Sequence, residues 1–174
     1  MVDYVYDKAE LIKPCEPVSS QEEGWEVCDR ILDAYEDLIN TLPEDTDVYG
    51  ISANQIGIKK RVCMIVPHDT EKEIIFLMNP EIMGVSEEIE FEESCLSFPE
   101  ETFKTKRYRS IVVGAMNHQE PVYFFGEGLS VVESIATQQH VDLMNGLTPH
   151  DKAISEDTDG QEEKDIGKTI FSPT

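Results

Sequence analysis

The sequence predicts a single α+β domain over residues 1–154, followed by an acidic tail over residues 155–174. The chain of 174 residues suits one compact domain, and 40% of its residues are hydrophobic, which is enough to build a core. Strand patterns fill its middle, between an amphipathic helix near the start and a buried helix near the end. This order favours an α+β fold over a doubly wound α/β fold, in which strands and helices would alternate.

The first predicted element is a helix that begins after residue 20. Pro14 and Pro17 enforce an extended entry, and Ser20 with Glu23 has the spacing of a capping box. Pro43 lies beyond its end. The apolar residues between these limits recur with a period near 3.6, which predicts a continuous face against the core: Trp25, Cys28, Ile31, Leu32, Tyr35, Leu38 and Ile39.

Strand patterns occupy most of the remaining chain. Residues 61–66 and 74–78 are apolar runs joined by a turn, and an extended run then continues through Phe91. Two more strands are predicted over residues 111–116 and 122–125. The last regular element is a helix from about Val131 to Asn145.

The net charge of -22 restricts the partners of the chain. It comes from 14 basic and 36 acidic residues, and it repels phosphate backbones and anionic membranes. Neither nucleic acid nor a membrane is therefore expected as a partner. The one basic cluster, residues 104–109, is short and is interpreted as a solvated strand edge. A protein partner with a basic surface would complement the acidic charge.

The cysteines and the N-terminus favour a cytoplasmic setting. The first residues lack the basic region and apolar core of a signal peptide, and no run approaches the length of a membrane span. The four cysteines show no CxxC pairing, so neither a structural zinc site nor a disulfide framework is indicated. Cys28 and Cys63 lie in apolar patterns and are predicted to be core thiols.

Three short motifs carry the information about function: Gly50-Ile51-Ser52-Ala53-Asn54-Gln55-Ile56-Gly57, then Glu92-Glu93-Ser94-Cys95-Leu96-Ser97, and finally Gln138-Gln139-His140-Val141-Asp142-Leu143. In this order and spacing they resemble the GxGxAAxQ, EGCLS and HExxH motifs of the peptide deformylases. The resemblance covers roughly residues 1–150 by the order of elements. It implies a fold in which antiparallel sheets enclose the motif helix.

The first two motifs retain much of the family pattern. In the family, the Gln of the first motif and the backbone N–H of the Leu after the Cys polarise the formyl oxygen. The resemblance places these roles on Gln55 and Leu96, where such donors would stabilise a developing oxyanion. It also places substrate contacts at Gly50, Ser94 and Arg107.

The third motif departs from the family pattern. Aligned on Asp142 and Gly146, the first metal-binding His of the family falls on Gln139, the catalytic Glu on His140, and the second metal-binding His on Leu143. A catalytic metal needs three protein ligands and an open position, and two His at i and i+4 of a helix normally supply two of them. Only Cys95 remains from this ligand set. Shifting the alignment by one residue also fails, because it places Val141 and Met144 at the Glu and second His.

The resemblance therefore implies a protein whose metal site is lost and which is not a hydrolase. It would need no metal cofactor and would act as a peptide-binding or structural protein, with Leu143 filling the metal cavity. The alternative is an active deformylase that removes formyl groups from formyl-Met peptides and holds iron, nickel or zinc with an unusual ligand set. One such set is Cys95, His140 and His150, since His140 and His150 match the outer spacing of a metzincin-like motif.

A role in a protein complex is the remaining expectation. Ser52-Ala53-Asn54-Gln55 and Asn145-Gly146 resemble the deformylase-like sequences of bacteriophages. A phage origin would favour a component of the virion or one that acts in the host cytoplasm. In the acidic tail, Ile170 and Phe171 form an apolar pair that is expected to contact a partner.

Overall fold

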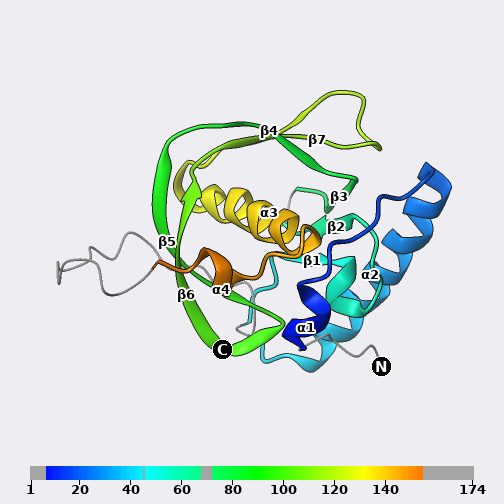
Figure 1. The fold of residues 1–174 in the computed structure, drawn as a ribbon, viewed down its shortest axis with the longest axis horizontal. Helices are drawn as coiled ribbons and strands as arrows, with labels where there is room; N and C mark the ends of the chain where they lie inside the picture. The colour runs from blue at the N-terminus through cyan, green and yellow to red at the C-terminus, as the bar shows by residue number, and fades with distance from the viewer. Residues whose placement is uncertain (1–6, 45, 68–71, 155–174) are drawn as a thin grey trace.

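The computed structural model describes residues 7–44, 46–67 and 72–154 (Figure 1). The tail, with Ile170 and Phe171, lies outside the described residues. The elements are, in chain order, α1 (Lys8–Leu11), α2 (Gln21–Thr41), β1 (Gly50–Ser52), η1 (Ala53–Ile56), β2 (Val62–Ile65), β3 (Ile75–Met78), β4 (Glu81–Val85), β5 (Glu88–Cys95), β6 (Phe98–Tyr108), β7 (Ile111–Gly114), β8 (Val122–Phe124), η2 (Gly128–Ser130), α3 (Val131–Met144) and α4 (Pro149–Lys152).

The predicted α+β fold with antiparallel sheets is confirmed. In the described part of the chain, three sheets have the strand orders β1-β2-β3, β4-β7-β8 and β5-β6, and every pair of neighbouring strands in them is antiparallel. Figure 1 shows α3 in the middle of the molecule, enclosed by these sheets, with α2 on the outside. Nearly all residues of α3 are buried, its polar and charged side chains included, so the helix has no face that is open to solvent along its length.

Helix α2 begins and ends close to the predicted limits. The Ser20 side chain accepts a hydrogen bond from the Glu23 backbone N–H, as predicted. The Glu23 carboxylate, however, bonds Ser19 instead of returning to Ser20. The capping box is therefore only half formed.

The prediction that all seven apolar residues of α2 face the core is wrong for two of them. Trp25 is 46% exposed and Ile39 is 49% exposed. The buried face also includes Gly24, where a Cβ atom would lie 2.3 Å from the Met78 sulfur. Because the helix approaches β3 so closely at Gly24, Trp25 is left on the flank, where its ring meets the edge of Phe76.

The basic cluster belongs to β6, an 11-residue strand that the sequence patterns did not predict in full. Its register with β5 places Lys104 opposite Glu92 and Lys106 opposite Glu90, so that opposite charges pair across the strands. Lys106 is exposed, as expected of a solvated strand edge, but Arg107 is buried. This difference follows from the alternation of side chains between the two faces of a strand.

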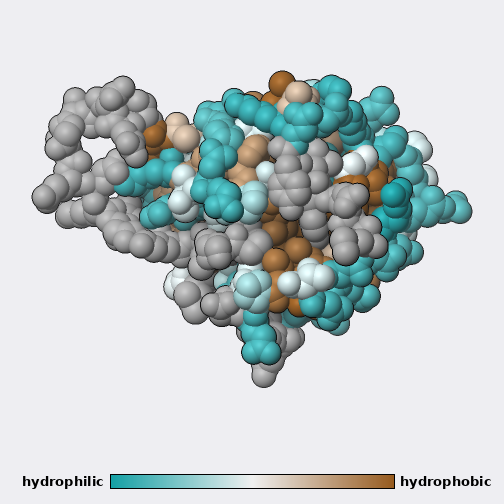
Figure 2. All heavy atoms as spheres, turned by 90° about the horizontal axis from the view of Figure 1, so that it is seen from below, coloured by the Kyte–Doolittle hydropathy of each residue, from teal (hydrophilic) through white to brown (hydrophobic). Residues whose placement is uncertain are grey.

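The four cysteines are buried. Separately, no described helix is long and apolar enough to cross a membrane. Cys28 and Cys63 lie in the core as predicted, and all four cysteines are free thiols. Figure 2 shows a face on which hydrophilic side chains predominate around a central apolar strip.

Candidate functional site

The first motif folds into β1 and η1, and it directs Gln55 inward. The Gln55 side-chain oxygen accepts hydrogen bonds from the Ser52 backbone N–H at 3.0 Å and the Ser52 hydroxyl at 3.2 Å. Its Nε2 donates to the Ser97 hydroxyl at 3.3 Å and to the Cys95 sulfur at 3.6 Å. Gln55 is fully buried, so both ends of its amide are engaged by the protein itself.

Cys95 ends β5 at a point where the register with β6 shifts. Burial raises the pKa of its thiol to about 12, although backbone and hydroxyl groups of Ser97 and the Phe98 backbone act in the opposite direction. The thiol is therefore protonated at neutral pH. The deprotonated form, which binds metals, is strongly disfavoured in this environment.

Leu143, near the end of α3, is fully buried and belongs to the same apolar cluster as Cys95. The other members of this cluster are Leu11, Phe98 and Phe103. The Leu143 backbone is also fixed, since its carbonyl accepts a hydrogen bond from the Asn54 side chain at 2.9 Å. The position aligned with the second metal-binding His is thus a packed hydrocarbon group.

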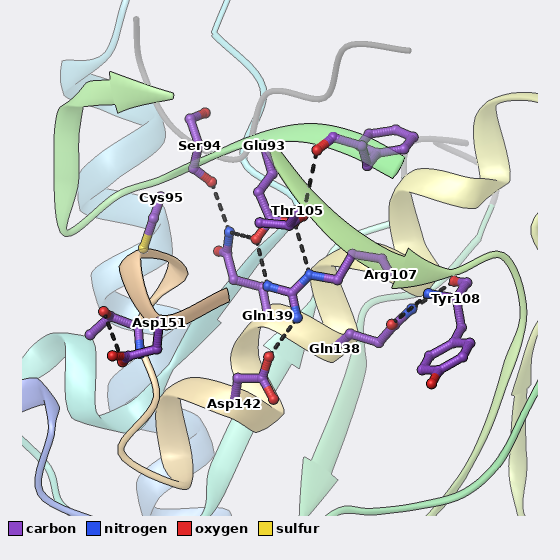
Figure 3. Close-up of polar contacts among 12 residues, drawn as sticks. Glu93, Ser94, Cys95, Thr105, Arg107, Tyr108, Gln138, Gln139, Asp142 and Asp151 are labelled. Carbon is purple, nitrogen blue, oxygen red and sulfur yellow. Dashed lines mark hydrogen bonds and ion pairs between the residues drawn. The ribbon is translucent and has the colours of Figure 1, made fainter. Parts of the chain in front are cut away.

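Gln139 lies one helical turn before Leu143 and faces β5 (Figure 3). Its Nε2 donates to the Glu93 carboxylate at 3.1 Å and to the Ser94 carbonyl at 3.0 Å. Both partners accept hydrogen bonds, which fixes the orientation of the amide. The Gln139 Oε1 atom is then left buried without a hydrogen bond.

Glu93 and Arg107 form the centre of a buried ionic network (Figure 3). Arg107 donates from Nη2 to Glu93 Oε1 at 2.6 Å and from Nε to Glu93 Oε2 at 2.9 Å, and its Nη1 pairs with Asp142. Thr105 adds a bond to Glu93 at 2.7 Å. Burial raises the pKa of Asp142, although the charge of Arg107 lowers it. Arg107 is only 3% exposed, so this arrangement directs its guanidinium at carboxylates and away from the surface.

His140 points away from this network, toward β1. A Cβ atom at Gly50 would lie 2.6 Å from both Cδ2 and Nε2 of the ring, so only glycine accommodates the imidazole here. Both ring nitrogens are buried without a hydrogen bond. Burial lowers the pKa of His140 to about 3, and the positive charge of Arg107 also lowers this pKa. The Gly50 backbone, which lies beside the ring, acts in the opposite direction. The imidazole is therefore neutral and a weak base at neutral pH.

The remaining candidate residues are dispersed. Leu96 is buried in the core cluster beside α2. His150 bonds Glu101 at 2.9 Å, and its ring meets the edges of Phe98 and Phe103. His150 is therefore held by groups of its own and does not complete a ligand set with Cys95 and His140. Within residues 7–44, 46–67 and 72–154, no three His, Cys, Asp or Glu residues are grouped so that they could hold a metal ion.

The residues at the three ligand positions do not fit a divalent metal. They offer a protonated thiol, an amide oxygen and a hydrocarbon group, whereas a catalytic site needs three donors and an open position.

The sequence did not predict the contribution of Ser52 and Ser97, which engage both ends of the Gln55 amide. The Ser52–Gln55 spacing was the available signal, because it is that of a capping box.

The molecule is a small α+β protein in which antiparallel sheets enclose the buried helix α3. Strand β5 contributes Cys95 to the candidate site, and η1 contributes Gln55. Comparison with known proteins specifies the family within the class of small α+β proteins. A family model described as "Polypeptide deformylase" matches residues 4–159. The chain belongs to the peptide deformylase family, whose members are hydrolases.

Individual relatives agree with this assignment. A peptide deformylase of Aquifex aeolicus is 32% identical over 143 residues, which cover 79% of this chain and 82% of the relative. One of Natranaerobius thermophilus is 37% identical over 127 residues, with 72% and 78% covered. Among solved structures, a peptide deformylase of Legionella pneumophila has a TM-score of 0.65 at 30% identity and covers 90% of this chain and 86% of its own. A probable peptide deformylase of synechococcus phage S-SSM7 has a TM-score of 0.66 at 25% identity, with 87% and 98% covered.

Proposed function

We propose that this family member has exchanged its metal centre for apolar packing and acts as a non-hydrolytic, peptide-binding or structural protein. The observation that carries the proposal is the contact cluster of Leu143 and Cys95, in which a hydrocarbon side chain occupies the position of a metal ligand. Gln139 supports it, since its amide nitrogen is committed to Glu93 and Ser94.

The chemistry of the site points in the same direction. Amide hydrolysis at neutral pH requires an activated water, and water without a metal keeps a pKa far above neutral. His140, at the position of the catalytic Glu, has its pKa lowered to about 3 by burial and is a poor general base. The Gln55 amide, which would polarise a substrate carbonyl, is bonded to Ser52, Cys95 and Ser97.

The second candidate is an active deformylase with an unusual ligand set. Family membership favours it, and so does the buried Gln139 Oε1 atom, which has no hydrogen bond and is a free acceptor. Iron, nickel or zinc would then be bound with Cys95 as thiolate. Binding would have to overcome the energy that holds this thiol protonated.

Elemental analysis and a deformylation assay separate the two candidates. Protein purified without added metal is expected to hold well below one iron, nickel or zinc per chain and to leave formyl-Met peptides intact. The active-enzyme candidate instead predicts metal near one per chain that is lost on Cys95→Ala. It also predicts turnover of about 1 per second or more that depends on Cys95.

A restored motif provides the complementary test. Changing Gln139→His, His140→Glu and Leu143→His together should create metal binding, because Cys95 already lies beside residue 143. Glu93 would receive a hydrogen bond from the new imidazole at 139, as carboxylates commonly do beside metal-bound His. The matched control omits Leu143→His and should stay metal-free. A folded triple variant that remains metal-free with iron or nickel supplied would show that the alignment of the third motif is wrong.

The place of action follows from the same proposal. Similarity to the probable deformylase of synechococcus phage S-SSM7 supports a bacteriophage origin. Such a protein would act in the host cytoplasm or as part of a virion or assembly complex, with a protein or peptide partner and neither nucleic acid nor membrane.

A further inference from the structure

The outer face of the β4-β7-β8 sheet carries large apolar side chains that the fold leaves exposed. Met83 on β4 is 64% exposed, and Tyr123 and Phe125 at β8 are 56% and 66% exposed. The two aromatic rings stack with centroids 5.7 Å apart and planes 10° from parallel. We call Met83, Tyr123 and Phe125 the outer apolar patch. Exposed apolar side chains grouped in this way are typical of interaction surfaces.

A hollow of about 250 Å³ lies beside the two aromatic residues of the patch. Its walls come from all three strands and include Val85, Val112, Tyr123 and Phe125. A hollow of this kind can receive an apolar side chain from another molecule, as the pockets at the centre of protein interfaces do.

The chain around Phe125 is fixed in position. The Phe125 carbonyl accepts a hydrogen bond from the Ser130 hydroxyl at 2.7 Å, and the Gly126 N–H donates to the Ser110 hydroxyl at 2.9 Å. At Gly126 a Cβ atom would lie 1.9 Å from the Arg109 carbonyl oxygen, so the backbone there is tightly packed. The aromatic pair is therefore held by a rigid support, which lowers the entropy cost of binding.

The charged residues within residues 81–85 and 110–128, which form the strands of the patch, are all glutamates. Residues 110–128, which include β7 and β8, contain two glutamates, Glu120 and Glu127, and neither Lys nor Arg. Strand β4 adds the exposed Glu81. The nearby cation, Arg109, is already paired with Glu87 at 3.0 Å. A second copy of this acidic chain would bring the same glutamates together, which repulsion disfavours.

We propose that the outer apolar patch docks a basic, amphipathic segment of a partner protein. An apolar side chain of the partner enters the hollow beside Tyr123 and Phe125, and its Lys or Arg side chains face the surrounding glutamates. This surface belongs to a sheet separate from the candidate functional site. The proposal therefore holds whether or not that site binds metal.

The probe is a labelled amphipathic peptide of leucine and lysine, used with the full chain and followed by fluorescence anisotropy. A sibling peptide has glutamate in place of each lysine, and a scrambled peptide keeps the composition but loses the apolar face. The variant Tyr123→Ser with Phe125→Ser removes the aromatic pair. The matched control, Ile39→Ser, removes an apolar side chain of similar exposure from α2.

The leucine–lysine peptide should bind, and the double variant should weaken binding about tenfold or more, as loss of an aromatic anchor does. Ile39→Ser should leave binding unchanged, and salt should weaken it. Equal binding of the scrambled peptide or the glutamate peptide would overturn the proposal, as would unchanged binding by the double variant. A dimer in sedimentation that disappears in the double variant would assign the patch to a second copy of the chain and also overturn it.

Discussion

Acidification should destabilise this protein through the buried His140. In the folded state burial lowers the pKa of His140 to about 3, whereas an unfolded chain has the ordinary value of about 6.5. Between these values the unfolded state binds the additional proton, so stability falls as the pH falls from about 6.5 toward 3. The full difference corresponds to roughly 5 kcal/mol, which is a large part of a typical domain stability of about 5–15 kcal/mol.

The variant His140→Leu isolates this contribution. It replaces an imidazole with two unbonded nitrogens by a hydrocarbon of similar volume, so stability at pH 7.5 should be maintained or raised. Urea unfolding at several pH values between 7.5 and 4 should show a steeper loss for the natural protein than for the variant. All other titratable groups are the same in the two proteins, so the comparison isolates residue 140. Parallel pH profiles would refute the assignment of His140 as a neutral buried group.

Three further stability predictions can be checked by urea unfolding at neutral pH. Leu143→Ala should cost about 2–4 kcal/mol, since it opens a cavity beside Cys95; a loss under about 1 kcal/mol would mean that Leu143 is not packed there. Gly50→Ala should destabilise by roughly 1–3 kcal/mol because the new methyl group meets the His140 ring, and His140→Ala should restore most of this loss. Arg107→Met should cost about 3–5 kcal/mol by leaving Glu93 buried without its cation, and the loss should shrink when Glu93→Gln is added.

The long elements of the fold could be predicted because their patterns are local. The apolar period of α2 and its Ser20 cap lie within a single segment, and so does the residue pattern of α3. The exposure of Trp25 could not be predicted in this way, because it depends on the close approach of Gly24 to Met78 on a distant strand. Strand β6 was obscured by its charges, which pair with β5 only once the hairpin has formed.

The sequence predicted several residues of the candidate site, but it did not predict the contacts that these residues make with one another. The three motifs identify Gln55, Cys95 and Gln139, and the structure brings all three to the region between η1, β5 and α3. The contact of His140 with Gly50, by contrast, joins residues 90 positions apart and follows from no local pattern. The same applies to the bonds of Arg107 to Glu93 and Asp142, which join residues 14 and 35 positions apart.

The reactivity of the four buried cysteines should report local unfolding of the protein. Burial raises the thiol pKa to about 11 for Cys15 and to about 12 for Cys28, Cys63 and Cys95. Because the thiolate is the form that reacts with oxidants and alkylating reagents, the folded chain should be inert to both despite its four reduced thiols. Each cysteine reacts only when its own surroundings open, so labelling rates measured residue by residue would map local unfolding across α2, β2 and the Cys95 hairpin.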